Sequence, residues 1–203
     1  MTLQQQLGNI DIYLLDQILK ERYQNCKKII DVGCGGGRNL VYFLQNDYEV
    51  YGLDPNEEAL SYTKSLANTL APNLPTSNFQ ITTIEDNNFP KENFDLVICS
   101  AVLHFAQSPE HFDKMLRATW QLLKPNGYFF ARLATSISIE NEIEYVGNQV
   151  YNLPDGSQRF LVNMETLLDY TEKLKAQLYE PIKTTNVQNL RAMTTWCLHK
   201  TVL

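Results

Sequence analysis

The segment Asp31-Val32-Gly33-Cys34-Gly35-Gly36-Gly37 contains the residue types that most directly suggest chemistry. It follows the apolar run 29–32 and precedes apolar residues at helical spacing, so a strand, a tight turn and a helix are predicted in that order. Glycine is needed where a ligand approaches the main chain closely or where φ must be positive. A helix N-terminus also offers unpaired N–H groups to an acidic part of that ligand.

Asp54 adds a polar group at the predicted end of the second strand, seventeen positions after Gly37. A carboxylate there can accept hydrogen bonds from both hydroxyls of a ribose, so a nucleoside-containing ligand is predicted across the carboxyl ends of adjacent strands. The dinucleotide fingerprint G-x-G-x-x-G would need glycine at position 38, which is Arg38. Counted from Gly33, the pattern is G-x-G-x-G, with Asp31 two positions earlier.

In these residues the chain resembles the class I (Rossmann-like) S-adenosylmethionine-dependent methyltransferases, whose first motif is D/E-x-G-x-G-x-G. The family's Phe-Asp-x-Val strand appears as Phe94-Asp95-Leu96-Val97, and its Leu-Lys-Pro-x-Gly turn as Leu123-Lys124-Pro125-Asn126-Gly127. The resemblance covers about residues 28–134. Within the family, Gly37-Arg38-Asn39-Leu40 is similar to the tellurite-resistance and thiopurine-type small-molecule branch.

The resemblance implies S-adenosylmethionine as the cofactor. The glycine loop would lie against its methionine part, Asp54 would bind the ribose, and either Glu85 or Asp86 would meet the adenine amino group. An Arg38 guanidinium would suit the cofactor carboxylate. The full set of cofactor-binding residues predicted here is Asp31, Gly33, Cys34, Gly35, Arg38, Asn39, Asp54, Pro55, Glu85, Asp86 and Ser100.

Methyl transfer from a sulfonium is an in-line displacement with an already activated donor. The protein must mainly align the reacting atoms and exclude water, so catalysis is expected to depend mostly on proximity. His104 follows the fourth predicted strand and is the catalytic candidate, as a base or as a group that orients the acceptor. The alternative is a polar residue that caps the strand exit.

Three arginines are candidates for holding an anionic acceptor: Arg132, Arg159 and Arg191, although each could instead form an ordinary salt bridge. Tyr13 in the first helix is expected to close over the cofactor site or simply to pack on the sheet. The aromatic residues of an irregular insertion are candidates for a substrate pocket or for a small core beneath a loop; they are Tyr145, Tyr151 and Phe160. No metal site is predicted.

The elements that must position these residues alternate between strands and helices. Strands are predicted at 29–32, 49–53, 79–83, 94–99 and 128–133, with helices at 10–23, 40–44, 57–70 and 109–123. After residue 134 we expect hairpin arms at 149–152 and 158–162, a helix from Asn163 to about residue 176, and paired strands at 177–185 and 192–200. This order predicts an α/β fold: a Rossmann-like, seven-stranded, mostly parallel sheet with an antiparallel C-terminal strand and helices on both faces.

One domain is expected over residues 1–203. Its parts are an N-terminal helical cap (1–27), a cofactor-binding core (28–134), an irregular insertion or lid with a helix (135–176) and a C-terminal hairpin (177–203). We see no internal repeat and no linker long enough to divide the chain.

Composition narrows the classes of partner. The 203 residues include 17 Lys and Arg against 23 Asp and Glu, a formal charge of −6, which argues against a general nucleic-acid binder or a polybasic membrane anchor. The four scattered cysteines match neither a disulfide framework nor a zinc site. The longest mostly apolar stretch, 96–106, is too short to span a membrane. With no signal-peptide pattern at residues 1–7, a cytoplasmic location is expected; the oligomeric state stays open.

Three functional hypotheses follow. The leading one is an S-adenosylmethionine-dependent methyltransferase that acts on a small-molecule acceptor. The alternative is a non-catalytic module of the same fold that binds the cofactor as a sensor or partner. The third, a nicotinamide-dependent oxidoreductase, is disfavoured by Arg38 and by the absence of a Tyr-x-x-x-Lys pair after the fourth strand.

Overall fold

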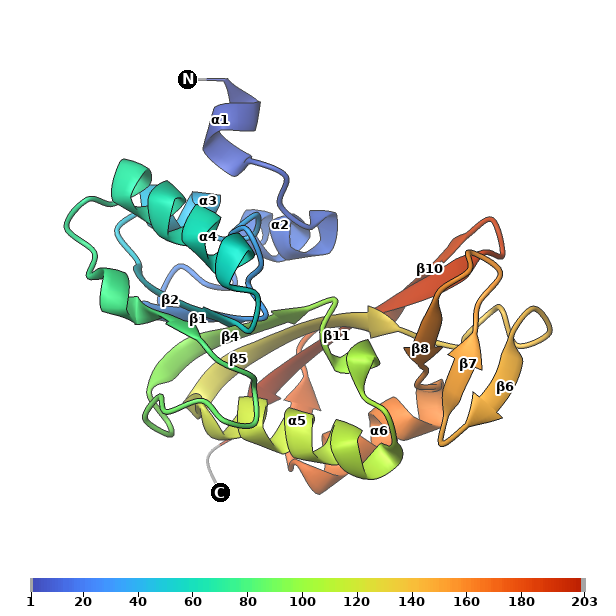
Figure 1. Cartoon of the computed structure of the whole chain (residues 1–203). Coiled ribbons are helices and arrows are strands. Elements are labelled where there is room, and N and C mark those ends of the chain that lie inside the picture. The colour runs from blue at the N-terminus through green and yellow to red at the C-terminus, as the bar shows by residue number, and fades with distance from the viewer. Residues whose placement is uncertain (1, 202–203) are drawn as a thin grey trace.

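A twisted sheet with the strand order β3-β2-β1-β4-β5-β11-β10 organises the computed structural model, which describes residues 2–201 (Figure 1). Strands β1 to β5 are parallel, β11 runs antiparallel to β5, and both β10 and β9 pair antiparallel with β11. The predicted fold class is confirmed. The strands are β1 Lys28–Val32, β2 Glu49–Asp54, β3 Phe79–Ile81, β4 Phe94–Ser100, β5 Leu123–Ala134, β9 Ala176–Leu178, β10 Lys183–Val187 and β11 Arg191–Lys200.

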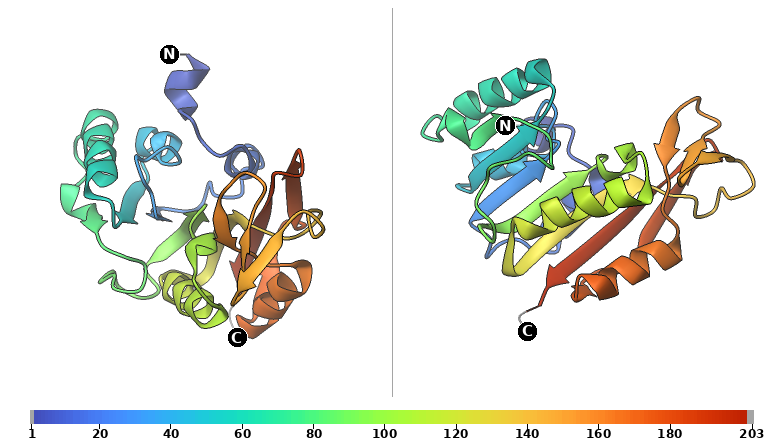
Figure 2. Two further views of the ribbon diagram at one scale, coloured as in Figure 1. Left: turned by 45° about the vertical axis from the view of Figure 1, so that its right-hand side comes forward. Right: turned by 60° about the horizontal axis from the view of Figure 1, so that its bottom comes forward.

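Helices cover both faces of this sheet (Figures 1 and 2). One face carries α1 Leu3–Leu7, α2 Ile12–Leu19, α3 Val41–Gln45 and α4 Glu57–Leu70, and the other carries α5 Pro109–Gln121 and α6 Met164–Lys173. Short 3-10 turns lie at Thr76–Asn78 and Leu103–Phe105. No helix within residues 2–201 is long and apolar enough to cross a membrane.

The alternation of side chains along the central strands produces two hydrophobic cores. On β5, Phe129 packs in the core beneath α5 and α6, whereas its neighbour Phe130 packs in the core beneath α2, α3 and α4. Val97 and Ile98 of β4 divide in the same way. A strand buried on both faces is apolar throughout, which explains why β4 is the strongest apolar run in the sequence.

Polar caps fix where the longer helices begin. Ser108 accepts a hydrogen bond from the His111 N–H, with Pro109 in the first helical position of α5. Asn56 and Asn163 cap α4 and α6 through the N–H groups three residues later. The bounds of α4 match the predicted helix 57–70, because a capped N-terminus and a 14-residue amphipathic pattern define both ends of the helix.

The C-terminal strands differ from the sequence prediction. The strand predicted at 177–185 is broken into β9 and β10, which pair with opposite ends of β11. Pro181 lies in the break and has no N–H to donate to a ladder. Glu180, beside it, is buried and pairs with Lys20 and Lys183.

The insertion after β5 forms a separate antiparallel sheet from β6 Glu144–Gly147, β7 Val150–Asn152 and β8 Gln158–Phe160. The two predicted hairpin arms correspond to β7 and β8, and β6 was missed. Figures 1 and 2 show this small sheet beside the ends of β10 and β11, beyond the carboxyl ends of the central strands. Thr135 ties it to β5, because its Oγ1 donates to the Val162 carbonyl at 2.8 Å.

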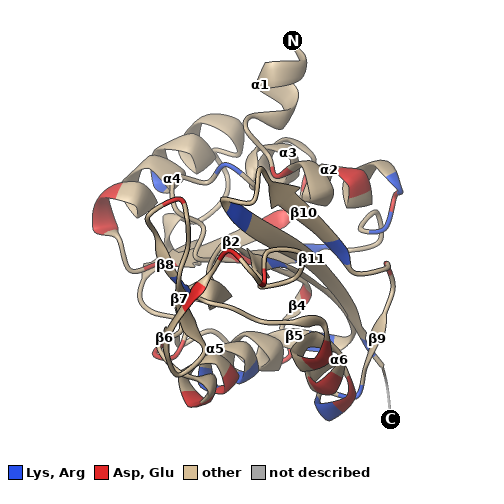
Figure 3. Cartoon of the chain, turned by 90° about the vertical axis from the view of Figure 1, so that its right-hand side faces the viewer, with Lys and Arg blue, Asp and Glu red and all other residues tan. Residues whose placement is uncertain are grey.

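Charged residues of both signs are interspersed around this end of the molecule (Figure 3). Acidic residues also gather in the first turn of α4 and along α6, as the red segments of Figure 3 show. In this view of residues 2–201, charges of both signs alternate and no continuous basic face is seen.

Candidate active site

The glycine loop lies between the carboxyl ends of β1 and β2, and two of its glycines, Gly33 and Gly37, leave little room for a side chain. Gly33 has φ +74°, and a Cβ at this position would lie 2.4 Å from Cγ2 of Val102. Gly37 has φ +78°, with Thr63 Oγ1 only 3.0 Å from the position of a Cβ. By contrast, a Cβ at Gly35 or Gly36 would meet nothing within 4 Å. The loop is thus packed on one side and exposes its main chain on the other.

Hydrogen bonds from both neighbouring elements hold the loop in place. The N–H groups of Gly33 and Cys34 donate to the Leu53 carbonyl at 2.8 and 3.0 Å. The Gly35 N–H donates to Asp54 Oδ2 at 2.8 Å, and Thr63 Oγ1 donates to the Gly35 carbonyl at 2.6 Å. Sequence reasoning missed Thr63, whose only signal was a polar residue on the buried face of a predicted helix.

The helix predicted at 40–44 corresponds to α3, Val41–Gln45, and turns separate it from the glycines. In those turns the N–H of Gly37 donates to the Cys34 carbonyl, and the N–H of Leu40 donates to the Gly37 carbonyl. The accessible part of the loop is therefore the main chain of Gly35 and Gly36, and not the free N–H groups that were expected at the start of a helix.

Asp31 is a buried carboxyl at the end of β1. Within residues 2–201 neither of its oxygens has a hydrogen-bond partner of ordinary geometry. Burial raises its pKa to about 8, and the nearby Arg38 guanidinium and Asn39 side chain offset this only in part. An unpartnered buried carboxyl is costly unless something pairs with it, so Asp31 is suited to a ligand that brings a positive charge or a donor.

Asp54 ends β2 and lies beside the loop, as predicted. Its two oxygens accept from the N–H groups of Gly35 and Asn56, both at 2.8 Å. Each carboxylate oxygen has a second lone pair, so Asp54 can still accept hydrogen bonds from two hydroxyls. Pro55, the next residue, is exposed.

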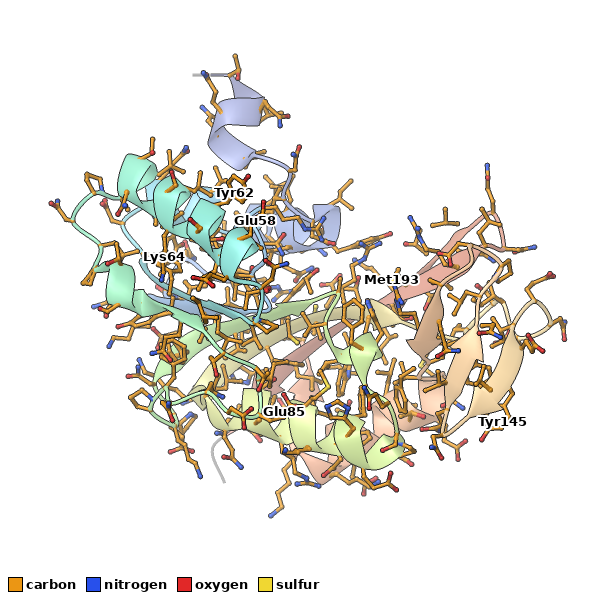
Figure 4. All side chains as sticks on the ribbon, viewed as in Figure 1. Glu58, Tyr62, Lys64, Glu85, Tyr145 and Met193 are labelled. Carbon is orange, nitrogen blue, oxygen red and sulfur yellow. The ribbon has the colours of Figure 1, made fainter. Side chains whose placement is uncertain are left out.

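The two acidic candidates after β3 lie in different surroundings. Glu85 is part-buried, and its Oε1 lies 2.6 Å from Nε2 of His111 in α5. Figure 4 shows Glu85 beside that helix. Asp86 is exposed and accepts a hydrogen bond from Thr83 Oγ1 at 2.8 Å. Ser100, at the end of β4, is buried, and its hydroxyl has no partner within residues 2–201.

Asp11 is a functional candidate that sequence reasoning missed. Its side chain is 1% exposed, caps α2 through the Tyr13 N–H, and accepts from Arg132 Nη1 at 2.9 Å. Its own N–H donates to Asn39 Oδ1 at 3.0 Å, and Arg38 Nη2 lies 3.9 Å from its Oδ2. Asp11 thus joins the N-terminal segment, the glycine loop and β5. The available signal was an Asp directly before a helical apolar stripe, the usual mark of an N-cap.

Tyr13 lies over this cluster rather than in an open pocket. Its ring is 5.2 Å from the Arg132 guanidinium carbon, and its hydroxyl bonds to the Thr185 hydroxyl. Cys34 is buried with its Sγ against Gly52, and burial raises the pKa of its thiol. Neither residue is therefore an exposed reactive group.

A cavity of about 260 Å³ lies between the sheet end and the β6–β8 sheet. Its walls include Ala101, His104, Arg132 and Ala134 from the sheet end, Leu153, Asp155, Ser157 and Arg159 from the insertion, and Val187, Arg191 and Met193 from β10 and β11. Figure 4 shows Met193 at this junction. The structure thus brings together His104 and all three candidate arginines, which are far apart in the sequence.

His104 is held in a single orientation at the cavity wall. It is buried, and its Nδ1 accepts a hydrogen bond from the Ala134 N–H at 3.1 Å. Burial and the nearby Arg159 charge lower its pKa to about 4, so the ring is neutral at pH 7. Because Nδ1 is the acceptor, the proton of the neutral ring resides on Nε2, which is a donor.

Of the two alternatives for the aromatic residues of the insertion, the structure favours a small core for Tyr151, which packs against Ala134, Leu153 and Leu161. Tyr145 and Tyr151 stack edge to face with centroids 5.3 Å apart on the small sheet, and neither lines the 260 Å³ cavity or the neighbouring 420 Å³ one. Figure 4 shows Tyr145 on the outer strand, away from the central sheet. Phe160 does line the neighbouring cavity, although its ring is buried against Phe112.

The residues around the glycine loop fit S-adenosylmethionine. An unpartnered buried carboxyl at Asp31 suits its ammonium group, and the remaining lone pairs of Asp54 suit its ribose hydroxyls. The open side of Gly35 and Gly36 leaves room for a ligand against the main chain. The sequence motif and the geometry of the loop therefore agree.

Comparisons with known proteins lead to the same family. Residues 30–131, half of the chain, match the family described as "Methyltransferase domain". A ubiquinone biosynthesis O-methyltransferase from Haemophilus ducreyi is 35% identical over 109 residues, covering 51% of this chain and 44% of that protein. The chain spans about half the length of the curated relatives it matches.

Solved structures show the same fold over nearly the whole chain. A Burkholderia thailandensis 1,6-didemethyltoxoflavin-N1-methyltransferase, bound to 1,6-didemethyltoxoflavin and S-adenosylhomocysteine, matches with TM-score 0.72 and 17% identity, over 97% of this chain and 80% of that one. TehB from Haemophilus influenzae matches with TM-score 0.68 and 18% identity, over 96% and 63%.

The family match also excludes the hypothesis of a nicotinamide-dependent oxidoreductase. The sequence had already argued against it, because Arg38 stands where the dinucleotide fingerprint requires glycine. The branch within the family stays a prediction. From its glycine loop, its sheet order and the match over residues 30–131, the chain belongs to the class I S-adenosylmethionine-dependent methyltransferases, whose methyl donor is S-adenosylmethionine.

Proposed function

We propose that this chain transfers a methyl group from S-adenosylmethionine to a small-molecule acceptor held in the 260 Å³ cavity. The observation that carries the proposal is the position of this cavity next to the glycine loop. Ala101 lines the cavity, and the following residue, Val102, lies against Gly33 of the loop. A molecule in the cavity and a cofactor on the loop would thus be neighbours, as a displacement reaction requires.

The predicted cofactor residues are proposed to hold the cofactor as follows. Asp31 and the main chain of Gly33, Cys34 and Gly35 would bind the methionine part, and Asp54 would bind the ribose. Glu85 is the better adenine candidate, since it is part-buried, whereas Asp86 is exposed. When bound, the cofactor supplies an activated methyl group, so the chain itself needs to add alignment and exclusion of water.

His104 is proposed to orient the acceptor and not to remove a proton from it. The low pKa of about 4 makes its ring a weak base, and Nδ1 is already engaged with the Ala134 N–H. Its Nε2–H remains available to donate to an acceptor oxygen or nitrogen. A fixed donor next to Arg159 positions a substrate without changing its own protonation state near neutral pH.

We propose one methyltransferase domain over residues 1–203, with the predicted division at 27, 134 and 176. The insertion supplies a wall of the cavity through Leu153, Asp155, Ser157 and Arg159, which supports its role as a cover for the acceptor. Family relatives that act on small molecules, such as the toxoflavin-precursor enzyme, favour an acceptor of that class.

The first test is a thermal-shift comparison of the purified chain with S-adenosylmethionine, S-adenosylhomocysteine and NADH. A ligand at a hundred times its dissociation constant stabilises the folded state by about 2.7 kcal/mol. We expect the two adenosyl ligands to raise the midpoint and NADH to leave it unchanged. The variant Asp54→Ala should lose most of the adenosyl effect, while Asp86→Ala should keep it.

The second test is transfer of a radiolabelled methyl group from S-adenosylmethionine into the small-molecule fraction of a cell extract. Label that enters small molecules supports an enzyme with such an acceptor. Adenosyl binding without any transfer would support the sensor alternative, and label found only in RNA or protein would contradict a small-molecule acceptor.

A further inference from the structure

The cavity beside the glycine loop is lined by more positive than negative charge. Three guanidinium groups line it, from Arg132, Arg159 and Arg191, against the single carboxylate of Asp155. They come from β5, from the insertion and from the start of β11. Three arginine side chains thus surround one small cavity, although the chain as a whole has a net charge of −6.

The partners of these arginines leave one cation unmatched. Arg132 pairs with buried Asp11 at 2.9 Å, and Arg191 lies 3.6 Å from Asp155. Arg159 has no carboxylate within 4.0 Å anywhere in the described chain; its Nη1 donates to the Gln158 carbonyl at 2.6 Å. Counting Asp11 and Asp155 against the three guanidinium groups, the surroundings of the cavity carry one positive charge in excess.

Arg159 is also held where its charge acts on the cavity. Its guanidinium carbon lies 4.9 Å from the Phe105 ring centroid, in a cation–π contact that fixes the group without neutralising it. It lines the 260 Å³ cavity and the neighbouring 420 Å³ cavity, and His104 lines both as well. The Nε2–H of His104 adds a neutral donor beside this cation.

Apart from Ser157, the rest of the wall is apolar, and the space is small. Ala134, Leu153 and Met193 supply carbon surface. A volume of about 260 Å³ equals that of about nine molecules of liquid water at roughly 30 Å³ each. The cavity therefore suits a compact molecule with an apolar body and one charged end.

We propose that the methyl acceptor is a compact organic anion, bound through its negatively charged group by Arg159 and Arg191, with the His104 Nε2–H as an additional donor. This inference rests on the proposed function of the cavity as the acceptor site. Guanidinium groups bind carboxylates and phosphates through two parallel N–H···O bonds, so either oxyanion satisfies the site.

The test measures binding of matched probes to the protein saturated with S-adenosylhomocysteine. The pairs are 4-hydroxybenzoate with 4-hydroxybenzamide, phenylacetate with phenylacetamide, and phenyl phosphate with phenol. We expect at least one anionic member to bind with a dissociation constant about tenfold or more below that of its neutral partner, as a charged hydrogen bond provides. The carboxylate and phosphate pairs distinguish the two kinds of anion.

Two variants of Arg159 and one control test whether the preference for anionic probes arises in the cavity. Arg159→Gln should weaken binding of the anion about tenfold and leave the neutral partner unaffected, whereas Arg159→Lys should keep part of the preference. The matched control is Arg117→Gln on α5, which removes an exposed arginine that pairs with Asp113 and lines neither cavity. The control should bind every probe as the wild type does.

The inference is overturned when neutral members bind as tightly as their anions, or when no anion in the panel binds the wild type more tightly than Arg159→Gln. Binding of S-adenosylhomocysteine is recorded for every variant and separates the two levels of failure. If the wild type does not bind S-adenosylhomocysteine, the proposed function is wrong. If the wild type binds it normally but shows no preference for anions, only the proposal of an anionic acceptor is wrong.

Discussion

Gly33 shows how much a single backbone position constrains this fold. Its φ of +74° and the 2.4 Å from a hypothetical Cβ to Val102 Cγ2 are two separate penalties. We predict that Gly33→Ala lowers the free energy of unfolding by about 2–4 kcal/mol, the sum of left-handed strain and overpacking. Urea denaturation measures this. In Gly33→Ala with Val102→Ala the steric part should be recovered, and Gly36→Ala should be nearly neutral because its Cβ meets nothing within 4 Å.

Asp31 predicts a dependence of stability on pH. Its folded pKa of about 8 lies above the ordinary value of 3.8, so between these values the folded state holds a proton that the unfolded state has lost. Its contribution to stability is full below about pH 4 and is lost as pH rises toward 8, by about 1.4 kcal/mol per pH unit between pH 5 and 7.

The measurement is the unfolding free energy of the wild type and Asp31→Asn from pH 5 to pH 8, without ligand. Because Asn cannot ionise, the variant should become progressively more stable than the wild type as pH rises. A constant difference across the range would show that the Asp31 carboxyl is not protonated in the folded state.

At the scale of elements, one buried carboxylate, that of Asp11, joins the start of α2 to β5, in addition to the apolar packing of Leu14. Asp11 caps the helix and pairs with Arg132, whose side chain is 20% exposed. We predict that Asp11→Ala costs about 3 kcal/mol, because it leaves a part-buried guanidinium without its partner. Hydrogen exchange of the α2 amides should become faster in the same variant.

The matched comparison for this prediction is Asp16→Ala in the same helix. Asp16 pairs with Lys20 and Lys183, and all three side chains are 36–38% exposed. An exposed pair contributes about 0–1 kcal/mol. Equal losses in the two variants would contradict the role given to Asp11.

Sequence reasoning recovered the elements that have strong local signals. The bounds of α4 followed from its cap and its amphipathic pattern, and β4 from its apolar run. It missed β6, most of whose residues are exposed, because its pairing depends on which neighbours the chain meets after folding. It also missed the break at Pro181, although a proline within a predicted strand is a local signal against a continuous ladder. The glycine loop was predictable because its residues lie within seven consecutive positions.

The 260 Å³ cavity was only partly predictable for the same physical reason. Arg132, Arg159 and Arg191 were each candidates, but their meeting at one cavity depends on how the insertion sits on the sheet end. Tyr145 had the right residue type for a binding pocket but is exposed and lines neither cavity. Successive side chains of a strand point to opposite faces of the sheet, and residue type alone does not determine which face a given side chain occupies.

At the scale of the whole molecule, the central sheet lies between the two hydrophobic cores, and its strands contribute side chains to both. Both tryptophans, Trp120 and Trp196, belong to the core beneath α5 and α6, whereas the glycine-loop residue Cys34 belongs to the other. Because the shared strands bury side chains in both cores, we predict a single cooperative unfolding transition.

Tryptophan fluorescence and far-UV circular dichroism should therefore give coincident urea midpoints. S-adenosylhomocysteine should raise the tryptophan midpoint as much as the dichroism midpoint, although it is proposed to bind beside the other core. Midpoints that separate on adding the ligand would mean that the two faces unfold independently.

The buried carboxyl of Asp31 has one more consequence, for the heat of ligand binding. Near pH 7 the group holds a proton, and a ligand that places a positive charge beside it favours the ionised form. Complex formation would then release a proton into the buffer, and its observed enthalpy would vary with the ionisation heat of that buffer. Calorimetry of S-adenosylhomocysteine in phosphate and in Tris would count the protons released, and Asp31→Asn should bring that number to zero.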